Sequence, residues 1–258
     1  IKGISLLTRL EKAFSIPPTD PETGLVYCKL NKRGVSFGFT DIVVHSGDLL
    51  FCSILRYRAA LRMIDILEVV GKSNQSNYYQ EIASKIANNI FDRFCGKNGL
   101  LHASTGKSNQ LDIWGSAFAV YVGILNPSQS LKISHALIKA LDANTIAWKG
   151  NIRHVPTDYD FNNETVWEEI VDIGTFPKNT YQNGAYWNTP TGWICYAVSQ
   201  VNPEVAKNLA TEYIQQLKSD DFRRGDEFGA PFECIHPDGN HRQNPVYLTS
   251  VTCPLAAF

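Results

Sequence analysis

The sequence predicts an all-α protein built as an α/α toroid, in which helical hairpins form an inner and an outer ring. Eight helical stretches alternate along the chain between two kinds, one amphipathic and the other apolar on nearly all sides. A polar loop containing glycine precedes each apolar stretch. Because an all-round apolar helix has to be covered by neighbours, a ring of apolar helices inside a ring of amphipathic ones explains the alternation.

The amphipathic helices are expected to form the outer ring, since each has one apolar and one polar face. In 77–95, for example, an apolar residue recurs at every fourth position, with charged and polar residues opposite. The predicted outer helices span 1–14, 77–95, 130–147 and 205–219.

The apolar helices are expected to form the inner ring. The stretch from Asp48 to Val70 has only a narrow polar stripe, which indicates burial on more than one side. Gly71 ends this stretch, and Asn126-Pro127 ends the next one. The predicted inner helices span 48–70, 112–125, 186–201 and 246–258, the last of which only begins before the sequence stops.

The composition excludes several classes of partner. The formal net charge of -1 implies no attraction to nucleic acid. The sequence contains no run of 18 uncharged apolar residues, so it predicts no membrane span. No phosphate-binding loop, dinucleotide fingerprint, zinc-protease motif or nucleophile elbow occurs, so we expect no cofactor and no metal ion. The six cysteines form no CxxC pair, which favours reduced thiols and a cytoplasmic setting.

The central stretch, 99–118, joins an extended segment, a polar loop and the start of an apolar helix. Asp112 opens that helix, where it can serve simply as the N-cap. The alternative is a carboxylate at the mouth of a cavity, with the indole of Trp114 two residues on. An extended segment, 24–28, also leads to an acid at Asp41, and this recurrence favours the alternative. We therefore expect loops and inner-helix N-termini to cluster at one end of the ring, where function is expected.

Four motifs lie in the loops of the predicted ring. They read Gly38-Phe-Thr-Asp41, Gln110-Leu-Asp-Ile-Trp-Gly115, Tyr181-Gln-Asn-Gly-Ala-Tyr-Trp187 and Gly229-Ala-Pro-Phe-Glu233. Together with the alternation of helices, they resemble the six-hairpin glycosidases, the α/α-barrel superfamily of sugar-cleaving enzymes. The stretch 181–187 resembles the aromatic-rich loop that lines the sugar cleft in the neutral-invertase branch. The resemblance implies a glycoside hydrolase with a carbohydrate substrate.

A full ring in that superfamily has twelve helices, and the sequence shows eight. We therefore expect residues 1–258 to be a single toroid domain within a longer protein, with the other helices supplied mainly from the N-terminal side. An open flank of the ring would expose an apolar patch or pair with another subunit, and the oligomeric state stays open.

Hydrolysis of a glycosidic bond needs two carboxyl groups, one to protonate the leaving oxygen and one to activate water or attack directly. The candidates at loop ends are Asp41, Asp112 and Glu233, with Asp112 as the general acid and either of the others as the base. The ordinary alternatives are a turn or cap for Asp41 and a structural glutamate for Glu233. Glu168 and Glu169, in the long loop 148–185, are further candidates.

The predicted substrate-binding residues are aromatic, histidine and amide side chains near the same loops. Aromatic faces suit the C–H faces of sugars, but core packing is their commoner role, and we assign Trp193 to the core. Histidines are more often structural than catalytic, and Asn183-Gly184 also suits a turn. The predicted set is Trp114, His102, His154, Gln182, Asn183, Tyr186 and Trp187.

Two other classes of function compete with a hydrolase. A terpene-type cyclase shares the ring of helices but needs Asp-rich clusters on its inner helices, which this sequence lacks. A non-catalytic carbohydrate-binding or scaffold protein would keep the aromatic residues without needing the carboxylates. Convergence of Asp112 and a second carboxyl group on one pocket would favour the enzyme.

Overall fold

The computed structural model of the chain describes residues 3–29, 42–107, 110–156, 168–170, 174–221, 223, 229–238 and 241–258. Each of the eight predicted helical stretches contains a helix. The helices are α1 (Leu6–Phe14), α2 (Leu50–Val69), α3 (Asn77–Phe94), α4 (Ile113–Tyr121), α5 (Pro127–Asp142), α6 (Thr191–Ser199), α7 (Pro203–Ser219) and α8 (Thr249–Ala257), with a short 3-10 helix η1 (Ser73–Gln75). None of the helices in the described ranges has the length and apolar character that crossing a membrane requires.

One error in the helix prediction affects the site: the stretch 186–201 is predicted to be helical from its start, but α6 begins only at Thr191. Tyr186 and Trp187 are extended instead, and their backbones bond to Ile235 and Ile152 respectively. Pro190 follows them at the N-cap of α6, and a proline disfavours helical backbone in the residue before it. The two aromatic residues therefore belong to the loop and not to the helix.

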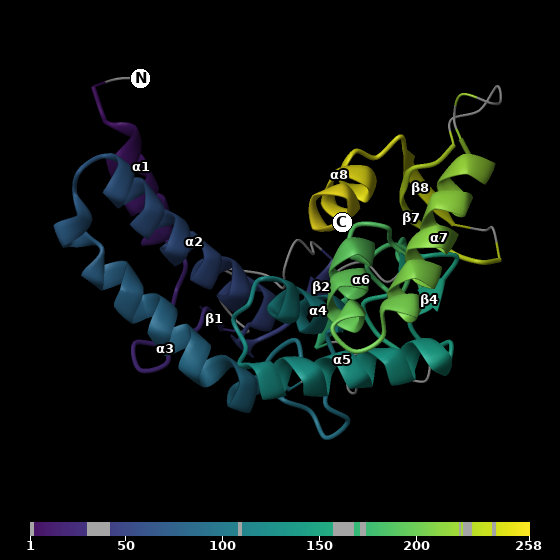
Figure 1. Ribbon diagram of the computed structural model, residues 1–258, viewed down its shortest axis with the longest axis horizontal. Helices are drawn as coiled ribbons and strands as arrows, with labels where there is room; N and C mark the ends of the chain where they lie inside the picture. Colours follow the sequence, from purple (N-terminus) through teal and green to yellow (C-terminus); the bar gives the residue numbers. More distant parts are fainter. Residues whose placement is uncertain are drawn as a thin grey trace.

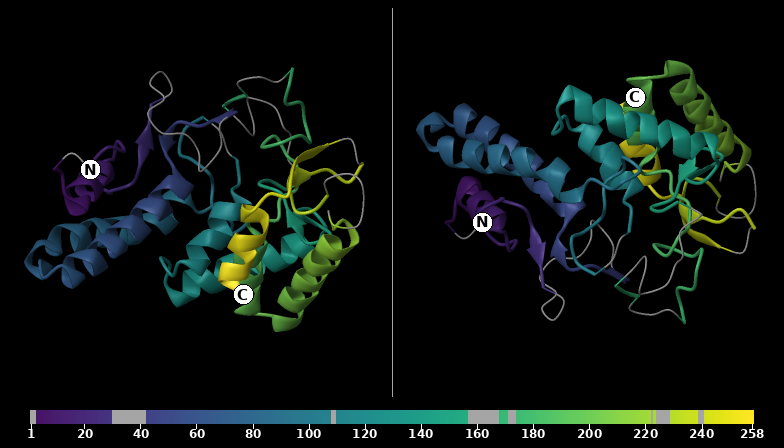
Figure 2. Two further views of the ribbon diagram at one scale, coloured as in Figure 1. Left: turned by 90° about the horizontal axis from the view of Figure 1, so that it is seen from above. Right: turned by 90° about the horizontal axis from the view of Figure 1, so that it is seen from below.

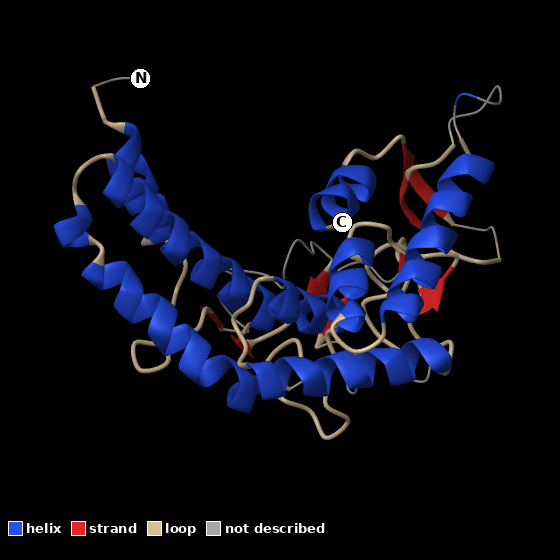
Figure 3. Ribbon diagram, in the orientation of Figure 1, coloured by secondary structure: helices blue, strands red, loops and turns tan. Residues whose placement is uncertain are grey.

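Short antiparallel strand pairs lie among the loops that join the helices (Figure 3). The predicted all-α class omits these pairs. They are β1 (Tyr27–Cys28) with β3 (Gly47–Asp48), β2 (Val43–Val44) with β6 (Glu169–Ile170), β4 (Ala147–Trp148) with β5 (Asn151–Ile152), and β7 (Phe232–Ile235) with β8 (Arg242–Pro245).

The helices form two arms joined at a common base (Figure 1). The first arm holds α1, α2 and α3, and both views of Figure 2 show α2 and α3 side by side as a long hairpin. The second arm holds α6, α7 and α8, while α4 and α5 lie toward the base. Several pairs of sequence neighbours contact one another, namely α2–α3, α4–α5, α5–α6 and α6–α7. This order is what successive hairpins produce, and the twelve-helix toroid stays a prediction.

The three complete apolar helices differ in how well they are covered. Every side chain from Ile113 to Val120 of α4 is buried, as an inner helix requires, and α6 is buried along most of its length. By contrast, α2 leaves Leu55 45% exposed and Leu61 37% exposed. The described part of the chain therefore covers α4 and α6 but leaves part of α2 open to solvent.

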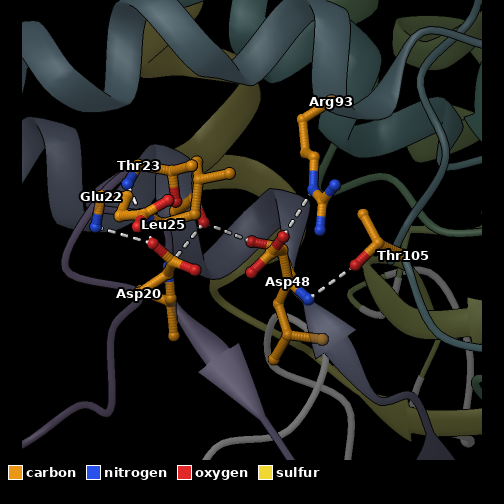
Figure 4. A network of polar contacts seen from close by, with 10 residues as sticks. Asp20, Glu22, Thr23, Leu25, Asp48, Arg93 and Thr105 are labelled. Atoms are coloured by element: carbon orange, nitrogen blue, oxygen red, sulfur yellow. Dashed lines mark hydrogen bonds and ion pairs between the residues drawn. The ribbon is translucent and has the colours of Figure 1, made fainter.

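Asp48 does not cap α2, although its position at the predicted helix start suggested that role. The N-cap residue of α2 is Leu49, which makes no capping bond through its side chain. Instead, the Arg93 Nε of α3 donates to the Asp48 Oδ2 over 2.7 Å, and the Asp48 amide donates to the Thr105 Oγ1 over 2.9 Å (Figure 4). Asp48 thus ties the start of α2 to the end of α3.

Candidate functional site

A cavity of about 580 Å³ opens where the two arms meet. Its walls come from α2, α4, α6, α8, the loop before α6 and the start of β7. Of the predicted site residues, Trp187 and Glu233 line it together. Its other lining residues are Phe51, Leu55, Arg58, Phe118, Tyr121, Tyr181, Thr189, Trp193, Tyr247, Thr249, Cys253 and Ala256.

Half of the residues that line this cavity are aromatic. On the loop side, the ring centroids of Tyr181 and Trp187 are 5.5 Å apart. On the helix side, Phe118 lies 4.6 Å from Trp193 and 5.0 Å from Phe51. Such surfaces suit ligands that present flat apolar faces, and sugar rings do so through their C–H groups.

Glu233 brings a carboxylate to this aromatic cavity. It stands on β7, is only 5% exposed, and its Oε2 accepts a hydrogen bond from Asn244 Nδ2 on β8 over 2.5 Å. Burial and the negative charge of Glu233 raise the pKa of the neighbouring Tyr247 phenol. The guanidinium of Arg58 lies across the cavity over the Phe118 ring, 5.8 Å from its centroid. A carboxylate so placed can bind a hydroxyl group or exchange a proton with a ligand.

Asp112 lies elsewhere, as the N-cap of the buried helix α4. Its Oδ1 accepts from the Gly115 amide over 2.7 Å, while its Oδ2 has no hydrogen-bond partner among the described residues. Burial raises the pKa of Asp112 to about 7, against the lowering effect of the Gly115 and Trp114 amides. The side chain is 1% exposed and is not part of the cavity wall. The capping interpretation of Asp112 therefore agrees with its surroundings, and convergence with Glu233 on one pocket is not observed.

Trp114 and His154 form a buried layer behind the cavity wall. The ring centroid of Trp114 lies 3.4 Å from that of His154 and 5.4 Å from that of Trp187. Burial and, to a lesser extent, nearby His45 lower the pKa of His154 to about 3. Both side chains are at most 2% exposed, so they support Trp187 and do not face the cavity.

Gln182 and Asn183 hold the loop from inside the protein. The Gln182 Oε1 accepts from the Ile42 amide over 3.0 Å, and the Asn183 Nδ2 donates to the Phe176 carbonyl over 2.9 Å. Both residues are at most 1% exposed. Their amides therefore fix the loop that carries Tyr181 and Trp187, and they do not line the cavity.

The other predicted residues lie away from the cavity or outside the described ranges. Tyr186 packs in a separate cluster, and half-buried His102 pairs its backbone with Leu111. The Glu168 Oε1 accepts from the amide and hydroxyl of Ser46, which makes it a loop-bracing residue. Asp41 and the side chain of Glu169 lie outside the described residues. In the described ranges, no group of His, Cys, Asp and Glu side chains is placed to hold a metal ion.

Comparison with known proteins gives a fold relationship. No protein-family model matches the chain, and no curated protein matches it. Among solved structures, one named "Sialidase" is similar with a TM-score of 0.61 and 11% sequence identity, over 89% of this chain and 21% of that chain. The chain thus spans about a fifth of the length of that structure. The similarity shows a shared fold.

Several cavity residues were not predicted from the sequence. Tyr181 is the first residue of the motif 181–187, recognised in the sequence, so it could have been predicted as a site residue together with Trp187. Trp193 was assigned to the core, and it is a buried member of the main hydrophobic core that also lines the cavity. No sequence pattern marks Phe118, Arg58 or Tyr247 as part of a site. These residues come together only because α2, α4 and the start of α8 meet in the fold.

Proposed function

We propose that the chain is part of a glycoside hydrolase and that the cavity between the two arms binds carbohydrate. The observation that supports this most is the combination of two groups of packed aromatic rings with the carboxylate of Glu233 in one cavity. The fold similarity to part of a structure named sialidase is compatible with a role in cleaving sugars.

In this proposal Tyr181 and Trp193 contact the sugar rings, Trp187, which is only 1% exposed, supports them within the wall, and Glu233 is the acid or base that exchanges a proton at the scissile bond. The second carboxylate comes from Asp41, as the sequence suggests, or from Asp112. Asp112 has the pKa of about 7 that suits a general acid near neutral pH, but its burial as a helix cap favours Asp41. Glu233 therefore replaces Asp112 as the leading catalytic candidate.

Non-catalytic carbohydrate binding is the second candidate function. One observation favours it: among the described residues that line the cavity, Glu233 is the one carboxylate. Hydrolysis by the paired mechanism needs two. A binding protein would use the same aromatic wall without the second acid.

The test is a screen of the purified protein for turnover of aryl-glycosides and disaccharides and for binding of the same sugars. Glu233→Gln keeps an oxygen that can accept from Asn244, so the variant should fold. If the protein is a hydrolase, this variant should lose about 10²–10⁴-fold in kcat while binding sugar within a few-fold of the parent. Trp187→Ala should weaken binding by about tenfold or more.

Glu204→Gln is the matched control, because Glu204 is an exposed glutamate on α7 paired only with Lys207 on its own helix. It should change neither turnover nor binding. Sugar binding without turnover in the parent protein would support the binding protein instead. Absence of both would overturn the assignment of the cavity to carbohydrate.

A further inference from the structure

The β7–β8 hairpin contacts two different walls of the cavity. Through Asn244 on β8 it holds the carboxylate of Glu233. Through His241, just before β8, it holds the loop that carries the aromatic wall, because the Tyr181 amide donates to the His241 Nε2 over 2.9 Å. One hairpin therefore sets the relative positions of the carboxylate and the Tyr181 ring.

The contact between His241 and Tyr181 depends on the charge of the imidazole. A backbone N–H group can only donate a hydrogen bond, so the His241 Nε2 that accepts from it has to be the unprotonated nitrogen of a neutral ring. When the ring is doubly protonated, an N–H group points at the Tyr181 N–H and the bond is lost. The Cys234 Sγ, 3.4 Å from the same nitrogen, is a second hydrogen-bond partner, and its thiol can donate only to an unprotonated Nε2.

Elsewhere the same loop is fixed by contacts that contain no titrating group near neutral pH. Tyr186 exchanges two backbone bonds with Ile235, and Trp187 exchanges two with Ile152. Arg153 donates to the Gly184 carbonyl over 2.8 Å and to the Asn179 Oδ1 over 2.7 Å. These contacts hold the loop on both sides of Tyr181.

Tyr181 itself has a left-handed backbone conformation, with φ of 41°. A residue with a large side chain adopts this conformation only when its surroundings hold it there. The bond to His241 is one of the contacts that can do so, because it engages the amide of Tyr181 directly. Loss of that bond would leave a strained residue free to relax away from the cavity.

We propose that His241 is a positioning residue of the cavity: its neutral ring holds the Tyr181 amide, sets the Tyr181 ring beside Trp187, and releases that ring when it takes up a proton. The inference rests on the proposed function only in treating the cavity as the carbohydrate site. Its structural part, the release of Tyr181, does not depend on what the cavity binds.

The groups around His241 determine the pH at which the release occurs. Burial lowers the pKa of His241, neighbouring His236 lowers it further, and the carboxylate of Asp238 raises it. The thiol of Cys234 stays protonated, since burial and the charge of Glu233 raise its pKa. From the loop side, the contact is the uncharged amide of Tyr181. The release is therefore expected at a more acidic pH than for an exposed histidine.

Hydrogen exchange at single amides, followed by NMR on the purified protein, tests the structural part without any ligand. Between about pH 8 and about pH 5, the protection factor of the Tyr181 amide should fall by about tenfold or more. The Tyr186 amide is the internal control, because it bonds to the Ile235 carbonyl and its protection should not change.

Three variants complete the test. His241→Gln offers an oxygen acceptor that does not titrate, so Tyr181 should stay protected at both pH values. His241→Ala removes the acceptor, so protection should be low at both. His236→Gln is the matched control on the same hairpin: it should keep the pH dependence and move it to a slightly higher pH, because the lowering effect of His236 on the pKa of His241 is removed.

Equal Tyr181 protection in the parent protein and His241→Ala, or a pH dependence that persists in His241→Gln, would overturn the proposal. Binding of a sugar found in the activity screen provides the second readout, and it should weaken in acid for the parent but not for His241→Gln. Binding that weakens equally in both proteins refutes the role of His241 while the proposed function stands. Release of Tyr181 without any sugar binding supports the role of His241 and rejects the proposed function.

Discussion

The side chain of Asp112 stabilises helix α4 by capping it, but its burial costs desolvation free energy when the carboxyl group is charged. Its Oδ1 satisfies the Gly115 amide in the first turn of α4, and Gly115 makes room for it, because a Cβ there would overlap the Asp112 Oδ2. Because the surroundings are fully buried, the carboxylate is disfavoured in its charged form. The folded protein therefore holds this proton to a higher pH than the unfolded chain does.

Substitution of Asp112 should change how stability depends on pH. From about pH 4 to about pH 7 the folded state binds more protons at Asp112 than the unfolded state does, so this group lowers the free energy of unfolding as pH rises. Asp112→Asn keeps the cap and removes the titration. Its stability relative to the parent should rise across that range, by up to about 4 kcal/mol, in denaturant unfolding measured at several pH values.

Asp112→Ala is the control for the cap, and it should be about 0.5–2 kcal/mol less stable than Asp112→Asn at every pH. A stability difference between Asp112→Asn and the parent that is flat with pH would show that Asp112 is ionised throughout. The buried His45 and His154 act in the opposite direction, since burial lowers their pKa values to about 4 and about 3. The stability that these two histidines contribute is complete above the ordinary histidine pKa and is lost as the pH falls through the lowered values. In the parent, proton uptake by Asp112 offsets part of this loss. Asp112→Asn lacks that uptake, so its stability should fall more steeply in acid than that of the parent.

Single residues also mark where sequence reasoning reached its limit. A carboxylate before an apolar helix looks the same whether it caps the helix or faces a cavity, so the sequence could not assign Asp112. Glu233 and Trp187 were recognised because they stand in loop motifs. Arg58 was not, because it contributes to the cavity only through the meeting of α2 with α4 and α8.

At the scale of elements, the β4–β5 hairpin positions the residues behind the cavity. Its two-residue turn, Lys149-Gly150, has φ values of 48° and 75°, which is the type I′ pattern that suits a tight hairpin. The turn packs against α7, where a Cβ on Gly150 would overlap the backbone of Tyr213. The strand that follows leads through Ile152, which pairs with Trp187, to Arg153 and His154.

Gly150→Ala should therefore destabilise the protein by about 2 kcal/mol or more, because it adds both a left-handed strain and a backbone overlap. Lys149→Gly is the matched control at the neighbouring turn position, which already tolerates a side chain, and it should be nearly neutral. Thermal and denaturant unfolding measure both. Equal effects of the two substitutions would mean that the contact with α7 contributes nothing.

Helices were predictable from the sequence and the short strands were not. Periodic apolar residues mark α3 and α7 over many turns, so their existence follows from the pattern alone. Tyr186 and Trp187 looked like the start of an inner helix because they continue its apolar run. Their extended conformation depends on partners at Ile152 and Ile235, which a local pattern cannot reveal.

At the scale of the whole molecule, the outer part of α2 leaves apolar side chains open to solvent. An apolar groove of about 450 Å³ runs between α1 and α2, with Phe14 and Met63 among its lining residues. The guanidinium of Arg56 stacks on the Phe14 ring at 4.2 Å and donates to the Phe14 carbonyl over 2.8 Å, so even the buried cation in the groove is occupied in bracing α1. Contiguous exposed apolar surface of this kind is typical of a site of association.

Such a groove should make the chain associate when it is studied alone. We expect the weight-average mass in sedimentation velocity to rise with protein concentration, because association buries apolar surface. Ala59→Glu places a carboxylate at the exposed wall of the groove and should shift the mass toward the monomer. Val69→Glu, at an 86% exposed site that does not line the groove, should leave association unchanged. A monomer at all concentrations would contradict the expectation.

The contact between Ile42 and Gln182 spans 140 residues of sequence, and this separation affects the order in which the protein folds during synthesis. The helical hairpins α2–α3 and α6–α7 join neighbours in sequence and can form as soon as they are synthesised. The loop at the cavity cannot, because the β2–β6 pairing and the Ile42 amide need segments that leave the ribosome much later. During synthesis the first arm therefore stands folded beside an unfinished cavity, and the wall that carries Tyr181 and Trp187 is among the last parts to assemble.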